Sequence, residues 1–175
     1  MPPRRSRAAG GASAGQARAV RTSAFDAALR LLARRAHSHV ELRRKLGRRG
    51  YPEEEIGEAL GRLSELGYLD DAAFAAGHVR RRSSSLGPLA LSAELAARGV
   101  ERRVSGQAMA GFDHTAQVAS ATRLAERLCG RNRPAGYSEL LDTVGAKLLR
   151  RGFSRGVARE ACWAVWSGRE AVPTP

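Results

Sequence analysis

The sequence has no long apolar run and is poor in cysteine, lysine and aromatic residues. Its 175 residues include 2 cysteines and 5% aromatic residues, and Lys45 and Lys147 are the only lysines among 30 basic side chains. Because no stretch of about eighteen uncharged apolar residues occurs, a membrane-spanning helix is excluded. The N-terminus carries arginines but no apolar segment, so a secretory signal is not expected. We therefore expect a soluble, cytoplasmic protein.

The residues that usually carry catalysis or bind metal do not stand at useful spacings. Cys129 and Cys162 lie far apart within helical patterns, which favours buried reduced thiols over a disulfide or a metal site. His37 and His39 are two positions apart, so they point to different helix faces, and no further ligand stands nearby at zinc-ligand spacing. A glycine-rich phosphate-binding motif is also absent from the sequence. We expect neither an enzyme nor a cofactor or metal site.

The charge of the chain is strongly positive. Basic residues exceed acidic residues by 30 to 17, which gives a net charge of +13 and a pI near 11.4. This excess predicts an anionic partner, either nucleic acid or an acidic protein surface. Residues 1–23 hold arginines, no acidic residue and little that could be buried, so they are predicted to form a disordered basic arm. Most of the positive charge still belongs to the folded part.

The body of the chain contains an internal repeat of helical character. Apolar residues recur at helical spacing from Phe25 onward and no run alternates with period two, so the fold is predicted to be all-α. The pattern Leu-x-x-Arg-Gly occurs at residues 46–50, 95–99 and 148–152, which defines a period of about fifty residues. A large apolar residue follows each glycine: Tyr51, Val100 and Phe153. The repeat predicts a helix that ends at a left-handed glycine, with the next residue folding back onto it.

Each repeat is expected to contain three helices. A second helix follows each glycine turn, beginning at Pro52, near Glu101 and near Ser154, and another helix precedes each pair, over residues 24–35, 70–82 and 113–129. Nine helices in three tandem repeats should pack end to end into an elongated, curved body. The expected domains are a basic arm at 1–23, repeats at 24–66, 67–111 and 112–168, and a flexible tail at 169–175.

Two adjacent carboxylates, Asp70 and Asp71, raise the question of a catalytic pair. Asp70 precedes an apolar helical run and fits an N-cap, and Asp71 then meets the positive end of the helix dipole. Leu69 and Phe74 are placed to form a hydrophobic staple across this helix start. Catalytic carboxylate pairs usually come from separate elements that face a cleft. The pair is therefore predicted to be structural.

Arginines cluster around the helix ends and are the candidate binding residues. Their recurrence at the same place in stacked repeats predicts a spaced basic row that contacts phosphates or acidic side chains. Aromatic residues that could stack on bases, among them Tyr68, Trp163 and Trp166, sit mostly at turn or core positions, so burial is predicted for them. The candidates are Arg43, Arg44, Lys45, Arg48, Arg49, Arg80, Arg81, Arg82, Arg98, Arg102, Arg103, Arg150, Arg151 and Arg155.

Two strings of the sequence are distinctive: HSHVELRRKLGRRGYPEEEIGEALGRLSELGYLDDAAFAAGHVRRR at 37–82 and GPLALSAELAARGV at 87–100. They resemble the bacterial RecX family, regulators of the RecA recombinase. The resemblance covers about residues 24–165 and implies three tandem three-helix units. It also implies binding along the groove of RecA filaments on DNA, with inhibition of ATP hydrolysis and strand exchange. Ala90, Ser92 and Ala93 replace basic side chains expected in the middle repeat, which moves the prediction there to residues 80–82, 98, 102 and 103.

The hypothesis is therefore a non-enzymatic, monomeric inhibitor of RecA that also contacts DNA nonspecifically. A second hypothesis is a DNA-binding module that grips DNA without RecA through helix-turn-helix-like units. The acidic residues 53–55 at the start of a would-be recognition helix argue against it, since they would repel phosphate. A third hypothesis, a hydrolase using Asp70 and Asp71, predicts loss of activity with intact folding on Asp71→Asn.

Overall fold

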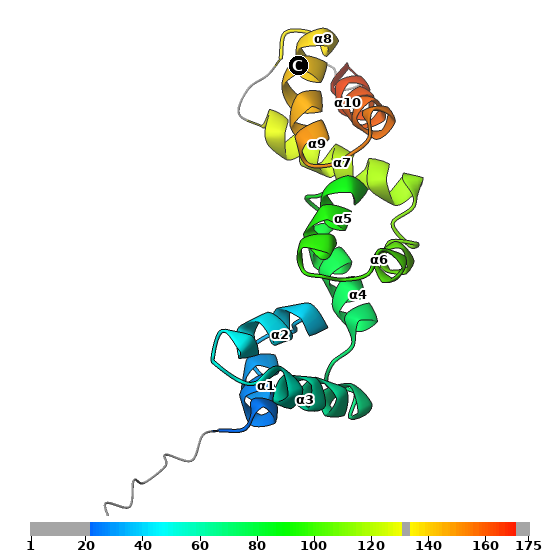
Figure 1. Cartoon of the computed structure of the whole chain (residues 1–175). Helices are drawn as coiled ribbons and strands as arrows, with labels where there is room; N and C mark the ends of the chain where they lie inside the picture. Colours follow the sequence, from blue (N-terminus) through cyan, green and yellow to red (C-terminus); the bar gives the residue numbers. More distant parts are fainter. Residues whose placement is uncertain (1–21, 131–133, 171–175) are drawn as a thin grey trace, which may run out of the picture.

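The structure, a computed structural model, describes residues 22–130 and 134–170, and all of its regular elements there are helices. The all-α class is confirmed. The helices are α1 (Ala24–Leu32), α2 (His39–Gly47), α3 (Glu53–Glu65), α4 (Asp71–Arg82), α5 (Pro88–Ala97), α6 (Arg102–Ala108), α7 (His114–Cys129), α8 (Tyr137–Leu140), the π-helical η1 (Leu141–Gly145), α9 (Ala146–Arg150) and α10 (Arg155–Glu170) (Figure 1). Because α8, η1 and α9 follow one another without a break, the described residues form nine helical rods, as predicted.

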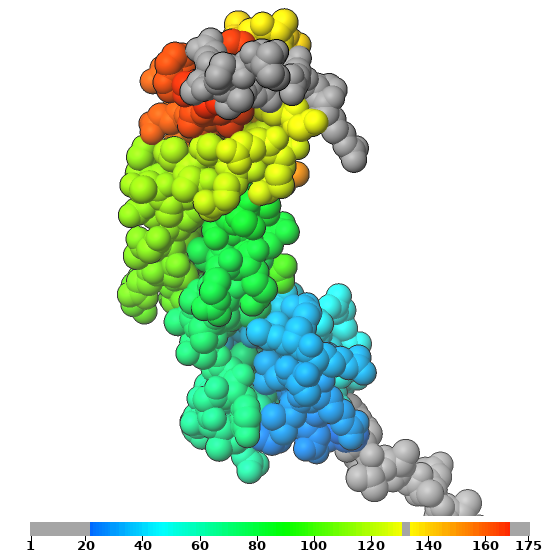
Figure 2. Space-filling view, turned by 180° about the vertical axis from the view of Figure 1, so that it is seen from behind, coloured from blue at the N-terminus to red at the C-terminus, as the bar shows by residue number. Residues whose placement is uncertain are grey.

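We group the helices into unit 1 (α1–α3), unit 2 (α4–α6) and unit 3 (α7–α10). The units follow one another along an elongated, bent body (Figures 1 and 2). The basic arm predicted for residues 1–23 lies outside the described residues except for its last two positions, where Ser23 caps α1. The tail predicted from residue 169 also lies outside them, apart from the backbone of the last two residues of α10.

The repeated turns have the predicted glycine geometry. Gly50, Gly99 and Gly152 have φ values of 79°, 77° and 84°, and the residue after each glycine donates its amide to a carbonyl five positions back, at 3.1–3.3 Å. This is the hydrogen bond of a Schellman motif, which satisfies a carbonyl that the helix end leaves open. Val100 and Phe153 are buried after their turns. A fourth such turn, at Gly67 with φ of 72°, ends α3 and was not predicted.

The buried apolar residues form two separate clusters. One cluster contains residues of unit 1 together with Leu69, among them the fully buried Leu42 and Leu46. The other runs from Phe74 to Val165 and joins units 2 and 3. Unit 1 therefore has a core of its own, whereas units 2 and 3 share one.

The first joint, between units 1 and 2, is mostly polar. The turn that ends α5 lies on the start of α2: a Cβ atom added to Gly99 would stand 2.4 Å from that of Val40, and the Ser38 hydroxyl donates to the Arg98 carbonyl. The Arg98 guanidinium also lies 2.7 Å from the Glu41 carboxylate. These contacts, rather than a shared apolar core, hold unit 1 against unit 2.

The second joint, between units 2 and 3, repeats this arrangement one unit further along. The turn that ends α9 lies on the start of α5, where the amides of Gly87 and Leu89 donate to the carbonyls of Arg151 and Gly152 at 2.8 and 3.2 Å. Helix α5 has no side-chain cap of its own. Unit 3 therefore supplies the acceptors that the first amides of α5 require.

The two adjacent carboxylates cap two different helices. Asp70 accepts hydrogen bonds from the amides of Ala72 and Ala73 at 2.7 and 3.1 Å and is the N-cap of α4, as predicted. Asp71 instead accepts from the amide of His39 at 2.9 Å, at the start of α2. The predicted staple is wrong, because Leu69 packs in the first apolar cluster and its intended partner on α4 packs in the second.

Candidate interaction surface

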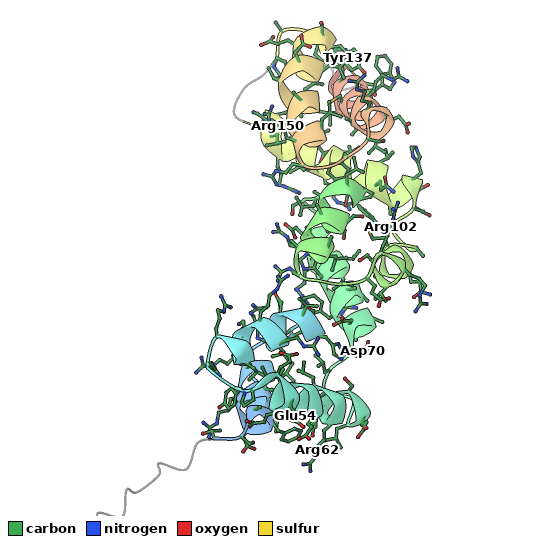
Figure 3. The ribbon with its side chains drawn as sticks, viewed as in Figure 1. Glu54, Arg62, Asp70, Arg102, Tyr137 and Arg150 are labelled. Carbon is green, nitrogen blue, oxygen red and sulfur yellow. The ribbon has the colours of Figure 1, made fainter. Side chains whose placement is uncertain are left out.

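Eight of the candidate basic residues are exposed, and their side chains have no hydrogen-bond or ion-pair partner within residues 22–130 and 134–170. They occur on all three units, at the ends of α2 and α4, at the start of α6 and around the turn from α9 to α10. Arg102 and Arg150 lie on opposite sides of the long axis in the view of Figure 3. The eight are Arg48, Arg49, Arg80, Arg81, Arg102, Arg103, Arg150 and Arg155.

The other candidates have partners or are partly buried. Arg43 pairs with Glu53 at 3.0 Å on the surface, and Arg82 pairs with Glu94 at 2.9 Å. Arg44, Arg98 and Arg151 donate to or pair with groups across the two joints. Lys45 is half-buried, and burial, followed by the charge of Arg35, lowers the pKa of its ammonium group. The joint arginines thus hold the units together, a role that the sequence did not predict.

A cleft between units 1 and 2 gathers positive charge. One part of it, about 570 Å³, is lined by Arg81, Arg82, Arg98 and Arg35, of which Arg35 was not a candidate. Glu94 is the only acidic residue in this lining, and it accepts one hydrogen bond from Arg82 and makes one with His78. Despite some burial, the hydrogen bond from Arg82 holds the pKa of Glu94 below its usual value.

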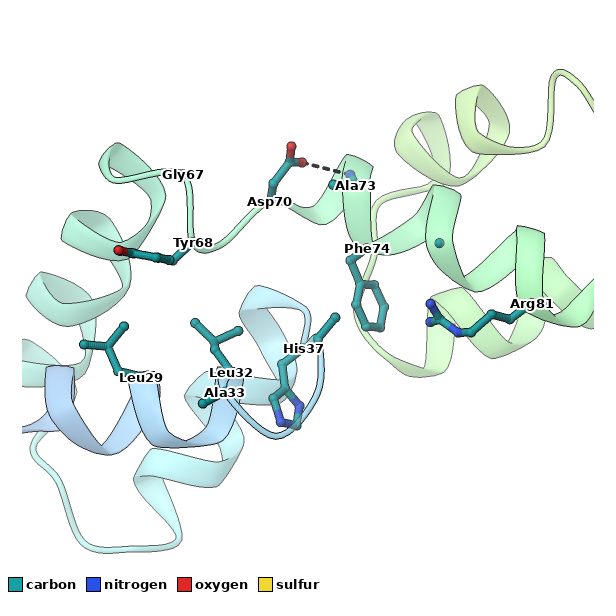
Figure 4. Close-up of a pocket in the computed structure, with 12 residues that line it drawn as sticks. Leu29, Leu32, Ala33, His37, Gly67, Tyr68, Asp70, Ala73, Phe74 and Arg81 are labelled. Carbon is teal, nitrogen blue, oxygen red and sulfur yellow. Dashed lines mark hydrogen bonds between the residues drawn. The ribbon is translucent and has the colours of Figure 1, made fainter.

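The cleft continues into an apolar part of about 460 Å³ under the link from α3 to α4 (Figure 4). Leu29 and Leu32 of α1 form one wall, and Phe74 and Arg81 of α4 form the other. The cleft lies where the two cores are separate, so its two walls belong to different packed bodies.

Glu41 is the electrostatic centre of the first joint. It lies within 2.7 Å of Arg98, 3.4 Å of Arg35 and 3.1 Å of the His37 ring. Burial raises the pKa of this carboxyl. The hydrogen bond with His37 and the charges of the two arginines lower the pKa by a larger amount, so the net shift is downward. His37 is itself buried, and burial lowers the pKa of its imidazole.

Two features of the surface differ from the sequence-based predictions. Tyr68 and Trp163 are 60% and 56% exposed, so the burial predicted for them is wrong, whereas Phe153 is buried as predicted.

The acidic residues at the start of α3 make contacts within unit 1. Glu53 pairs with Arg43, and Glu55 accepts a hydrogen bond from the amide at the start of α1, while Glu54 stays exposed (Figure 3). Cys129 and Cys162 are buried free thiols, as predicted.

Each of the three units has exposed arginines on its surface, and the cleft between units 1 and 2 has apolar walls. Among the described residues, no three metal-ligating side chains come together, and no helix is long and apolar enough to cross a membrane.

Comparison with known proteins identifies the family. Models of the first and second three-helix domains of RecX match residues 24–63 and 70–109. The regulatory protein RecX of Mycobacterium ulcerans is 39% identical over 135 residues, which cover 75% of this chain and 78% of that protein, and RecX of Chlorobaculum tepidum is 38% identical, covering 80% and 86%. The crystal structure of RecX from Lactobacillus salivarius shares the fold, with a TM-score of 0.74 at 23% identity over 82% of this chain and 95% of that one. This chain belongs to the RecX family, whose members are regulatory proteins and not enzymes.

Proposed function

We propose that this chain inhibits the RecA recombinase by binding the RecA filament on DNA and reducing its polymerisation, ATP hydrolysis and strand exchange. Membership of the RecX family carries the proposal, because the family resemblance implies RecA as the target. A regulator of a DNA-bound filament acts where the chromosome is. The proposal therefore includes a cytoplasmic site of action, and a single copy of the chain as the acting form.

The shape and charge of the body support this proposal. Its three units follow one another along an elongated body, and each unit carries exposed arginines without ion-pair partners among the described residues. An elongated body can contact successive filament subunits or the DNA beside them. Several weak charged contacts made by one elongated chain add as avidity, and they also make binding sensitive to salt.

The decisive measurement is the single-stranded-DNA-dependent ATPase rate of RecA against added protein, at substoichiometric ratios and at two salt concentrations. We expect inhibition well below one protein per RecA. The double variant Arg48→Glu with Arg49→Glu reverses two exposed charges at the end of α2, and neither side chain makes a hydrogen bond or ion pair with another described residue. Because like charges then face an anionic partner, we expect it to need about tenfold or more protein for half-inhibition.

A matched control keeps the same change in net charge. Arg30 and Arg34 are exposed arginines of α1 and the turn after it, and neither was a candidate. The double variant Arg30→Glu with Arg34→Glu should inhibit like the unmodified chain. Equal inhibition by both double variants would remove the α2 surface from the proposal. A chain that coats DNA tightly but leaves the ATPase rate unchanged would instead be a RecA-independent DNA-binding module.

A further inference from the structure

Helix α10 presents a stripe of two arginines and one tryptophan. Arg155, Arg159 and Trp163 stand four residues apart, so they lie on one face of the helix, and all three are exposed. Trp163 is 56% exposed and does not pack against the apolar core, in contrast to the half-buried Trp166 on the same helix. The core therefore does not explain the presence of an indole at position 163.

The indole of Trp163 is held in place by a neighbouring ring. Tyr137, at the start of α8, meets it edge to face, with ring centroids 5.5 Å apart and an interplanar angle of 87°. The Tyr137 hydroxyl donates to the carbonyl of Arg159 at 3.3 Å, which ties this ring to α10 (Figure 3). Edge-to-face pairs of this kind favour one ring orientation. Trp163 is thus an exposed aromatic side chain with a supported geometry.

The surroundings of Trp163 suit a strand of nucleic acid better than a protein surface. A protein partner that buried Trp163 as an anchor would be expected to contact further large apolar side chains around it. Among the described residues of α10, Trp163 is the only large apolar side chain that is exposed. The residues one and two turns before it are arginines. The acidic residue next to Arg159 in the chain, Glu160, has its carboxylate 2.9 Å from the ring of His114 at the start of α7.

We propose that Trp163 stacks on an unpaired nucleobase while Arg155 and Arg159 contact phosphates of the same strand. Sequence-tolerant binding of single strands combines aromatic side chains, on which bases stack, with a track of positive charge along the backbone. A duplex keeps its bases stacked inside and offers no free base face to an exposed indole. The ligand class is therefore single-stranded nucleic acid. This inference does not rest on the proposed action on RecA, because all residues of the site belong to this chain and the binding of a single strand to them requires no RecA.

The test uses the full chain and two fluorescently labelled strands of equal length, oligothymidylate and an abasic strand with the same phosphates. Binding is measured by fluorescence anisotropy without RecA. Because one stacked base changes the affinity by about 5- to 150-fold, Trp163→Ala should weaken binding of oligothymidylate by a factor in that range. The same variant should leave binding of the abasic strand unchanged, and Trp163→Phe should recover part of the loss.

The matched control is Tyr68→Ala, which removes another exposed aromatic side chain, 60% exposed, from the link between units 1 and 2. It should bind oligothymidylate like the unmodified chain. In a Trp166→Phe background, oligothymidylate should also quench the remaining tryptophan fluorescence, whereas the abasic strand should not. An equal loss on both strands, no loss on oligothymidylate, or no binding of oligothymidylate by the unmodified chain would each overturn the proposal. RecA inhibition that persists in Trp163→Ala would leave the proposed function standing.

Discussion

The substitution Gly152→Ala tests the joint between units 2 and 3, with Gly50→Ala as its matched control. Both glycines have positive φ, 84° and 79°, so an alanine at either position is strained by about 1–2 kcal/mol. The two sites differ in what a new Cβ atom meets. At Gly50 it meets nothing within 4 Å, whereas at Gly152 it would stand 2.4 Å from the Ala90 amide nitrogen.

The clash at Gly152 cannot be relieved by a side-chain rotation, because the nearest atom belongs to the backbone of α5. Units 2 and 3 must separate locally, which weakens the hydrogen bonds that cap α5. Overpacking of this kind typically destabilises by about 1–3 kcal/mol. We therefore expect a loss in unfolding free energy of about 2–5 kcal/mol for Gly152→Ala, against about 1–2 kcal/mol for Gly50→Ala.

The measurement is urea unfolding of the two variants and the unmodified chain, followed by far-ultraviolet circular dichroism. Tryptophan fluorescence provides a second probe, because both tryptophans lie on α10 in unit 3. The fluorescence midpoint should fall for Gly152→Ala and stay unchanged for Gly50→Ala, because Gly50 belongs to unit 1, whose core is separate from that of units 2 and 3. Equal losses for the two variants would refute the argument that the second joint is closely packed backbone against backbone.

Three further predictions concern the first joint and the buried thiols. Asp71→Ala removes the acceptor for the first amide of α2 and should lower the unfolding free energy by about 0.5–2 kcal/mol in urea titrations. The folded-state pKa values of His37 and Glu41 lie below their ordinary values of 6.5 and 4.5, so the unfolded chain binds more protons, and stability should fall as pH drops below about 6.5 and again below about 4.5. Burial raises the pKa of Cys162 to about 11, so iodoacetamide should alkylate this thiol slowly in the native protein and rapidly in urea.

Each of these predictions has its own control. Asp71→Asn keeps an acceptor oxygen and should lose less stability than Asp71→Ala, so equal losses would contradict the capping role. His37→Asn should remove most of the stability change between about pH 7.5 and about pH 5.5. If His37→Asn kept the same loss of stability over this pH range, a group other than His37 would be responsible for that loss. Fast alkylation of the native protein would show that the thiols are accessible.

The features that the sequence predicted correctly depend on neighbours along the chain. The capping by Asp70 and the left-handed turns at Gly99 and Gly152 follow from residues within one or two helical turns, and the pattern repeats three times. The six helix starts that the sequence predicted lie within one residue of the observed ones for the same reason. Only α1 ended clearly earlier than expected, at Leu32 rather than residue 35.

The features that the sequence did not predict depend on which faces meet in space. Arg98 pairs with Glu41 from 57 positions away, and Asp71 caps a helix that begins 32 positions earlier. Periodicity shows that a face is buried but not what covers it, so the split into two cores was also missed. The exposure of Trp163 could have been found: Ala161 and Val165 define the buried face of α10, and a residue two positions from either points away from it.

The division of the core also bears on synthesis of the chain. Every residue of the first apolar cluster lies between positions 24 and 69, so unit 1 has its complete core as soon as that stretch has left the ribosome. The second cluster extends to Val165, so units 2 and 3 reach their final packing only when almost the whole chain has emerged. Until then the start of α5, whose amides depend on carbonyls of Arg151 and Gly152, has no partner for its first turn. A nascent chain truncated before the third unit should therefore have a native first unit attached to an exposed, incompletely packed second one.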